Sequence, residues 1–91
     1  MDIAIINING EFFSGPYSRE LSETIDVKHY LVGLYRVHQL SKRDLRRLTR
    51  TINKCAGLAE ENPNILIILL RRFLPLDVAA RIVSDILTQE Y

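Results

Sequence analysis

The first fifteen residues form two apolar runs separated by a turn signal, which is the pattern of a β-hairpin. Residues 2–8 are rich in isoleucine, a β-branched residue that favours strands, and residues 11–14 can pair back against them. Asn9-Gly10 stands between the runs and readily adopts the positive φ angles of a two-residue turn. We therefore predict a hairpin over residues 1–15. An isolated hairpin is only marginally stable, so it must lie against helices or pair with another chain.

Helical periodicity follows in residues 25–39, where apolar positions recur every three or four residues. The positions that form this stripe are Val27, Tyr30, Leu31, Leu34, Tyr35 and His38. Gly33 interrupts the segment and costs about 1 kcal/mol relative to alanine in a helix, which indicates close packing of another backbone. We predict a helix over residues 25–39.

The next segment, residues 42–56, has the clearest amphipathic pattern in the chain. Ser41 can cap the amide of Asp44 at its start. At 100° per residue, the apolar side chains cluster on one side of the predicted helix. The cations occupy an arc of about 140° on the opposite side, here called the basic arc. Its members are Lys42, Arg43, Arg46, Arg47, Arg50 and Lys54.

Two further helices are predicted, over residues 63–74 and 77–89. Asn62-Pro63 starts the first of them, with asparagine as the cap and proline at the first helical position. Residues 65–70 are apolar on every side of the helix. A helix with no polar face needs cover all round, so we expect it to lie at the centre of the fold.

These elements predict one small domain spanning residues 1–91, mainly α by content and α+β by strict class: a hairpin followed by a compact bundle of about four helices. The 91 residues are 47% hydrophobic and 25% charged, which suffices for a core. No apolar run approaches the roughly eighteen residues of a membrane span. A secretory leader is not apparent, and one cysteine allows no internal disulfide. We expect a cytoplasmic protein, or a nuclear one in a eukaryote or virus, that is not secreted and has no membrane contact.

The chain offers little for catalysis or metal binding. His29 and His38 would stand about two and a half helical turns apart and point in opposite directions, so they could not share a metal. Cys55 shares the helical phase of the buried residues, which favours a small core residue over a nucleophile. Glu60-Glu61 are adjacent rather than paired across a site. We expect no catalytic site, no metal and no cofactor.

The basic arc is the feature with functional content. Residues 42–54 carry six positive charges and one negative charge, a net of +5, so the rest of a chain with net charge +1 sums to −4. This asymmetry would orient the molecule toward an acidic protein surface or a phosphate backbone, although a solvated helix face is the simpler reading. Residues 34–48 can also be laid on a helix-turn-helix pattern. Tyr35 and Gln39 resist it, because a small residue and a glycine usually occupy those positions.

Two functions fit these observations. The first is a small, non-enzymatic regulatory or adaptor protein that contacts a protein partner or a second copy of itself, through the hairpin edge or the apolar helices. The alternative is a DNA-binding regulator that lays residues 42–54 on duplex DNA, as a dimer. We prefer the first because the net charge is near neutral and the helix-turn-helix match is imperfect.

Overall fold

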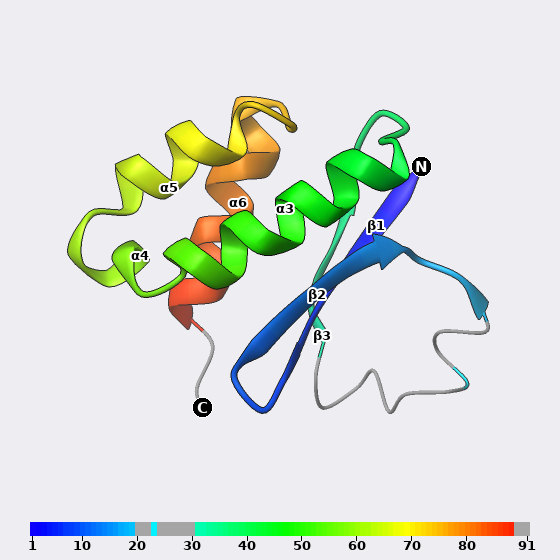
Figure 1. The fold of residues 1–91 in the computed structure, drawn as a ribbon, viewed down its shortest axis with the longest axis horizontal. Helices are drawn as coiled ribbons and strands as arrows, with labels where there is room; N and C mark the ends of the chain where they lie inside the picture. Colours follow the sequence, from blue (N-terminus) through cyan, green and yellow to red (C-terminus); the bar gives the residue numbers. More distant parts are fainter. Residues whose placement is uncertain (20–22, 24–30, 89–91) are drawn as a thin grey trace.

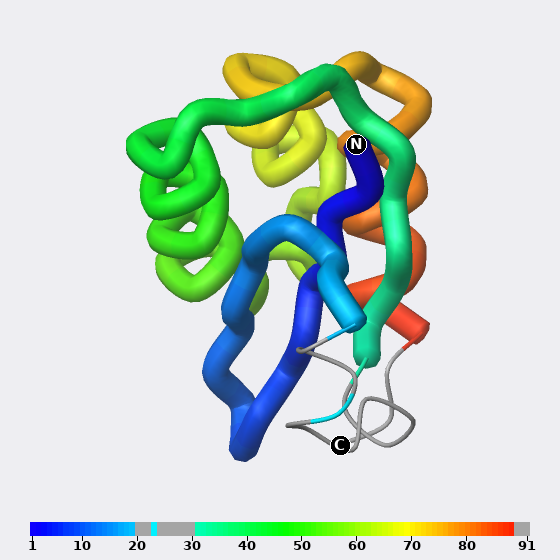
Figure 2. Tube along the Cα trace, turned by 90° about the vertical axis from the view of Figure 1, so that its right-hand side faces the viewer, coloured from blue at the N-terminus to red at the C-terminus, as the bar shows by residue number. Residues whose placement is uncertain are grey.

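The structure is a computed structural model that describes residues 1–19, 23 and 31–88. These residues form a three-stranded antiparallel sheet of order β2-β1-β3 and four helices, which is the expected α+β class. The elements are β1 (Asp2–Ile8), β2 (Glu11–Pro16), β3 (Leu31–Arg36), α3 (Lys42–Cys55), α4 (Leu58–Glu61), α5 (Pro63–Leu70) and α6 (Leu76–Thr88). Figures 1 and 2 show α3 beside β2 and α6 beside β3, while α4 and α5 join these two helices away from the sheet.

The predicted hairpin is confirmed. Asn9 and Gly10 have φ angles of 53° and 87°, and they connect β1 to β2 as a two-residue loop between Ile8 and Glu11. Positive φ at both positions is the requirement that the Asn-Gly pair meets with least strain. The second strand extends to Pro16, slightly beyond the predicted end.

The third strand corrects the prediction of a helix over residues 25–39. Residues 31–36 form β3, which pairs antiparallel with β1, and residues 24–30 lie outside the described part of the chain. Leu34 belonged to the predicted apolar stripe, yet its exposed fraction is 44%, whereas that of Tyr35 is 1%. Leu34 and Tyr35 therefore face opposite sides of the sheet, as successive residues of a strand do.

A register shift explains why this strand resembles a helix in sequence. Two successive residues of β1 pair with Gly33 and Leu31, so Val32 stands between them without a partner in the ladder. Val32 and Tyr35 are both buried, and the extra residue places them three apart instead of two or four. Spacing of three is also the spacing of a helical face, so the apolar pattern alone does not separate the two structures.

Tyr35 ties β3 to α6. Its ring crosses Gly33, where an added Cβ atom would lie 2.6 Å from Tyr35 Cζ, so a side chain rather than the expected backbone requires glycine there. Its hydroxyl donates a 2.5 Å hydrogen bond to Asp85 Oδ2 of α6. Burial, and then the hydrogen bond to the carboxylate, raises the pKa of the Tyr35 phenol above its ordinary value. The phenol is therefore a protonated donor throughout the neutral range.

Side chains of α3 close the outer edge of β2. Asn53 Oδ1 accepts from the Phe12 N–H at 2.6 Å, and Asn53 Nδ2 donates to the Phe12 carbonyl at 2.8 Å. One helical turn earlier, the hydroxyls of Ser14 and Thr49 are 2.5 Å apart. The carboxamide supplies the donor and acceptor that another strand would offer, so the β2 edge is already occupied at Phe12.

The core lies between the sheet and the helices. Its largest fully buried side chains come from β1, β3, α3, α5 and α6: Ile3, Ile5, Tyr35, Leu48, Ile52, Leu66, Leu70 and Ile82. The helices predicted over 42–56 and 77–89 are confirmed to within one residue at each end that the structure describes. The short helix α4 was not predicted, because four residues are too few to show a period.

The helix predicted over residues 63–74 is shorter and less central than expected. The helix α5 ends at Leu70, and residues 71–74 form tight turns in which Leu70 accepts from the amides of both Phe73 and Leu74. Pro75 follows Leu74, and because proline has no backbone N–H the helix does not resume after these turns.

Cover over α5 is one-sided, contrary to the prediction for residues 65–70. Leu66 and Leu70 are fully buried, but the exposed fractions of Ile65 and Ile68 are 42% and 62%. The fold places neighbours against one side of α5 only, so its apolar composition extends to the surface.

Every helix between residues 31 and 88 is too short or too polar to cross a bilayer.

Candidate binding groove

The basic arc lies where the sequence predicted it, on the exposed face of α3. All six of its side chains are exposed, whereas Leu45, Leu48 and Ile52 are buried on the opposite side of the helix. The predicted cap is present, because the Ser41 hydroxyl accepts from the Asp44 amide at 3.1 Å. The cap and the buried leucines fix the rotation of α3, and that rotation presents the cations to solvent.

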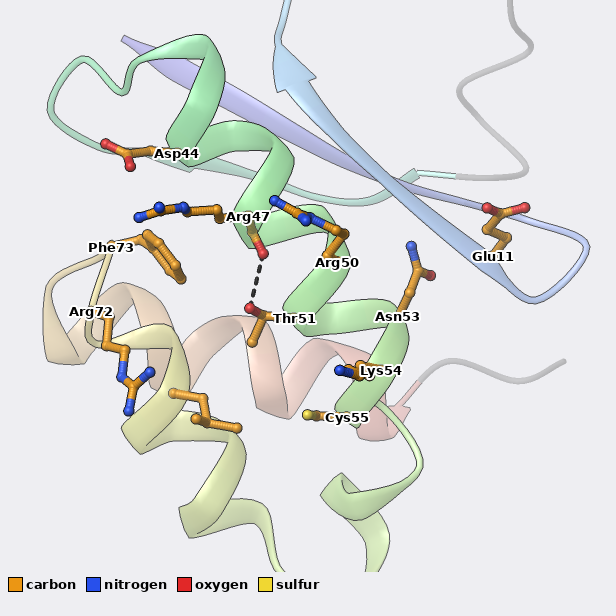
Figure 3. Close-up of a pocket in the computed structure, with 11 residues that line it drawn as sticks. Glu11, Asp44, Arg47, Arg50, Thr51, Asn53, Lys54, Cys55, Arg72 and Phe73 are labelled. Carbon is orange, nitrogen blue, oxygen red and sulfur yellow. Dashed lines mark hydrogen bonds between the residues drawn. The ribbon is translucent and has the colours of Figure 1, made fainter.

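A groove of about 990 Å³ runs between α3 and the end of α5 (Figure 3). The residues that line it are Glu11, Asp44, Arg47, Arg50, Thr51, Asn53, Lys54, Cys55, Leu69, Arg72 and Phe73. Three members of the basic arc stand on the α3 wall, and Arg72 stands on the facing wall. Figure 3 shows Arg47 extending from α3 toward Phe73. Cations from two separate elements therefore converge on one depression.

Part of the remaining surface of the groove is apolar. Leu69 and Phe73 on the α5 side are half-buried, as is Cys55 on the α3 side, and Cys55 and Phe73 also pack against the core. The prediction that Cys55 is a small core residue is thus correct for one side of the thiol only, since its other side lines the groove. The Thr51 hydroxyl donates a 2.8 Å hydrogen bond to the Arg47 carbonyl.

Two acidic side chains line the groove as well. Figure 3 shows Asp44 and Glu11 at its margins, well apart from each other. Four cations against two carboxylates leave a net charge of +2 on the lining. Cations therefore predominate on the lining, which favours an anionic ligand.

Arg72 and Phe73 are the groove residues that sequence reasoning missed. The sequence placed them in a continuing helix over residues 63–74, with no relation to the basic arc. The tight turns after Leu70 instead direct this segment toward α3. No local pattern in the sequence joins Arg72 to the basic arc, because Arg72 is eighteen residues beyond Lys54 and only tertiary packing brings both to one groove.

The helix-turn-helix interpretation of residues 34–48 is wrong in its geometry. That motif needs a helix immediately before the recognition helix, whereas β3 and the segment 37–41 precede α3. His38 is exposed in this segment, and His29 lies outside the described residues. Across residues 1–19, 23 and 31–88, no three His, Cys, Asp or Glu side chains gather where they could hold a metal ion.

Comparisons with protein-family models, with curated proteins and with solved structures find no match for this chain. Function must therefore be inferred from the surface of the chain itself. That surface offers a basic helix face whose one flank borders an apolar depression with a further arginine across it.

Proposed function

We propose that the protein is a non-enzymatic regulatory or adaptor module that binds an acidic surface of a partner protein through the basic arc of α3. The observation that carries this proposal is that Arg72, from a separate element, lines the same groove as Arg47, Arg50 and Lys54 of α3. Solvation alone does not require cations from separate elements to line one depression. Their mutual repulsion is relieved when carboxylates lie between them.

An acidic protein suits this surface better than duplex DNA does. A duplex presents phosphates and sugars to a helix that lies along its backbone, and neither fills an apolar depression such as the one around Leu69 and Phe73. Asp44 and Glu11 would also meet phosphates at the margins of the groove. The geometry of α3, without a helix directly before it, removes the motif that first suggested DNA.

Binding rather than chemistry is what the groove residues can support. No histidine, the base that most often activates a thiol nucleophile, is among the residues that line the groove with Cys55. The carboxylates of Asp44 and Glu11 lie at separate margins and form no acid–base pair. The arginines and the lysine are suited to holding anions through charge-assisted hydrogen bonds.

The proposal is tested by neutralising the arc. Arg43, Arg46, Arg47 and Arg50 are replaced together by glutamine, a good helix former, so the circular dichroism of α3 should be retained. Wild-type protein should capture an acidic partner from nuclease-treated host lysate, and the variant should lose it.

Binding of labelled duplex DNA, measured in parallel from about 50 mM salt upward, tests the alternative. If wild type binds duplex with log K falling against log salt at a slope near −4 to −5, as expected for four to six phosphate contacts, DNA binding replaces the proposal. Partner capture that survives the four substitutions would also contradict it.

A further inference from the structure

We infer that the groove between α3 and α5 takes a short segment of a partner protein in which carboxylates flank a large apolar side chain. This inference rests on the proposed function and narrows it, because it names the ligand chemistry and the site. The two walls of the groove differ in kind: α3 supplies three of the four cations, and the opposite wall supplies the apolar Leu69 and Phe73 together with Arg72. A ligand that contacts both walls must therefore carry both acidic and apolar groups.

Cation spacing on the α3 wall matches a helical or extended acidic ligand. Arg47, Arg50 and Lys54 are three and four residues apart, so they stand about 4.5 and 6 Å apart along the helix axis. Carboxylates one turn apart on an acidic helix, or two residues apart on a strand, have nearly the same rise. Arg72 can reach a carboxylate from the other side, and its planar fork suits bidentate contact.

The α5 wall continues the apolar surface beyond the groove. No residue of α5 between Pro63 and Leu70 is charged. Ile65 stands one turn before Leu69 on the same side of the helix and is 42% exposed, and Ile68 is 62% exposed. Exposed apolar side chains near the basic arc form a surface that a partner protein can cover. An inserted leucine, phenylalanine or tryptophan would cover Leu69 and Phe73.

Single-stranded nucleic acid also has a charged and an apolar face, but this groove suits it less well. Bases need successive aromatic platforms on which to stack. Phe73 is the one aromatic side chain that lines the groove, and it is half-buried against the core. Leu69 on the same wall accepts an aliphatic or aromatic anchor from a peptide without any stacking requirement.

A matched pair of double variants separates the groove from charge in general. The groove variant carries Arg47→Gln with Arg72→Gln, and the control carries Arg36→Gln with Arg71→Gln, two arginines outside the basic arc. Both remove two positive charges from exposed positions, but the control residues do not line the groove. All three proteins should show the same circular dichroism and denaturation midpoint.

The probe is a random peptide library displayed on phage and selected on the full chain. Enriched peptides should carry at least two acidic residues around a large apolar side chain. Their synthetic versions should bind wild type and the control variant alike and lose about tenfold or more in affinity with the groove variant. Alanine in place of the apolar anchor should cost about tenfold to a hundredfold.

Cys55 reports where the peptide binds, because it is the sole cysteine of the chain and lines the groove. Bound peptide should slow the reaction of its thiol with a soluble disulfide reagent, and the peptide with alanine at the anchor should not. Enrichment without an acidic pattern, equal loss in both double variants, or unchanged thiol reactivity would each overturn the inference. Displacement of the peptide by a single-stranded oligonucleotide at lower concentration would overturn it in favour of nucleic acid.

The two levels of the proposal fail in different ways. If the fourfold glutamine variant loses its partner while the Arg47/Arg72 variant keeps it, α3 is the docking face and the groove is not the site. If the fourfold variant also keeps the partner, the proposed function fails first.

Discussion

Helices α3 and α5 form the two walls of one groove, yet they reach the surface for opposite reasons. The helix α3 has a sharp division between buried leucines and exposed cations, so its outer face is polar as expected of a surface helix. The helix α5 has no such division, and Ile65 and Ile68 are exposed because the fold covers only the side of Leu66 and Leu70. Composition determined which side of α3 is buried, whereas only the neighbours determined it for α5.

The contrast separates two meanings of an exposed side chain. Cations on α3 are exposed at little cost because water solvates them. Isoleucines on α5 are exposed although their burial would be favourable. A partner that covered them would gain the free energy of burying this apolar surface. The predictions below test this division, first on α5, then at the contacts that hold the sheet edges, and finally on the basic arc.

Truncation on the two sides of α5 should give the largest difference. We expect Leu66→Ala and Leu70→Ala each to lower the free energy of unfolding by about 2–5 kcal/mol, because both side chains are fully buried. Ile68→Ala, on the same helix but 62% exposed, should cost less than about 1 kcal/mol. Urea denaturation at 25 °C measures all three. Equal losses for Ile68 and Leu66 would show that α5 is covered all round after all.

Loss of the Asn53 carboxamide should have the next largest effect. Asn53→Ala removes two hydrogen bonds to the backbone of Phe12, so we expect a loss of about 1–3 kcal/mol. Exposed Lys54 is the matched control, and Lys54→Ala should stay within about 0.5 kcal/mol. Hydrogen exchange at the Phe12 amide should accelerate in the Asn53 variant alone. Unchanged exchange would mean that α3 is held to the sheet by its leucines without this contact.

Tyr35→Phe tests the corresponding polar contact at the other edge of the sheet. At pH 7 we expect a loss of about 1–2 kcal/mol, because the hydrogen bond to Asp85 disappears. The pKa of the Tyr35 phenol is raised in the folded state, so its contribution is complete below the unfolded pKa of about 10 and declines as the pH rises above it. Denaturation at a series of pH values should therefore show the two proteins converging above pH about 10. A constant difference up to pH 11 would contradict this account.

Neutralisation on the outer face of α3 should have the smallest effect on stability. Arg43→Gln with Arg46→Gln should change the free energy of unfolding by no more than about 0.5 kcal/mol, because both side chains are exposed and solvated. Thermal denaturation followed by circular dichroism measures the effect. A loss above about 1 kcal/mol would assign the arc a structural role and weaken its assignment as a binding surface.

Sequence reasoning succeeded where a local signal has one physical interpretation. Asn9-Gly10 specifies a two-residue turn because few other residues accept positive φ at both positions. Ser41 begins α3 because its hydroxyl satisfies an amide that the helix leaves free. Such signals act within a few residues, so they need no knowledge of the rest of the fold.

The errors arose where distant parts of the chain decide the outcome. Val32 and Tyr35 belong to a bulged strand because β1 offers an edge with which residues 31–36 can pair. The local pattern of residues around Val32 carries no information about that edge. The groove depends on a turn that brings Arg72 beside α3 from another element. The basic half of the candidate site was therefore readable from the sequence, and its apolar half was not.

The contact between Asn53 and Phe12 has a consequence for how the chain selects its native arrangement. Both atoms of the carboxamide engage the N–H and the carbonyl of a single residue, and those groups point outward from β2 only in the native register. A slip of one residue between β1 and β2 would turn the Phe12 backbone groups toward β1 and its side chain to the opposite face. The contacts of α3 therefore favour the native register over a hairpin slipped by one residue, because only the native register lets Asn53 form both hydrogen bonds.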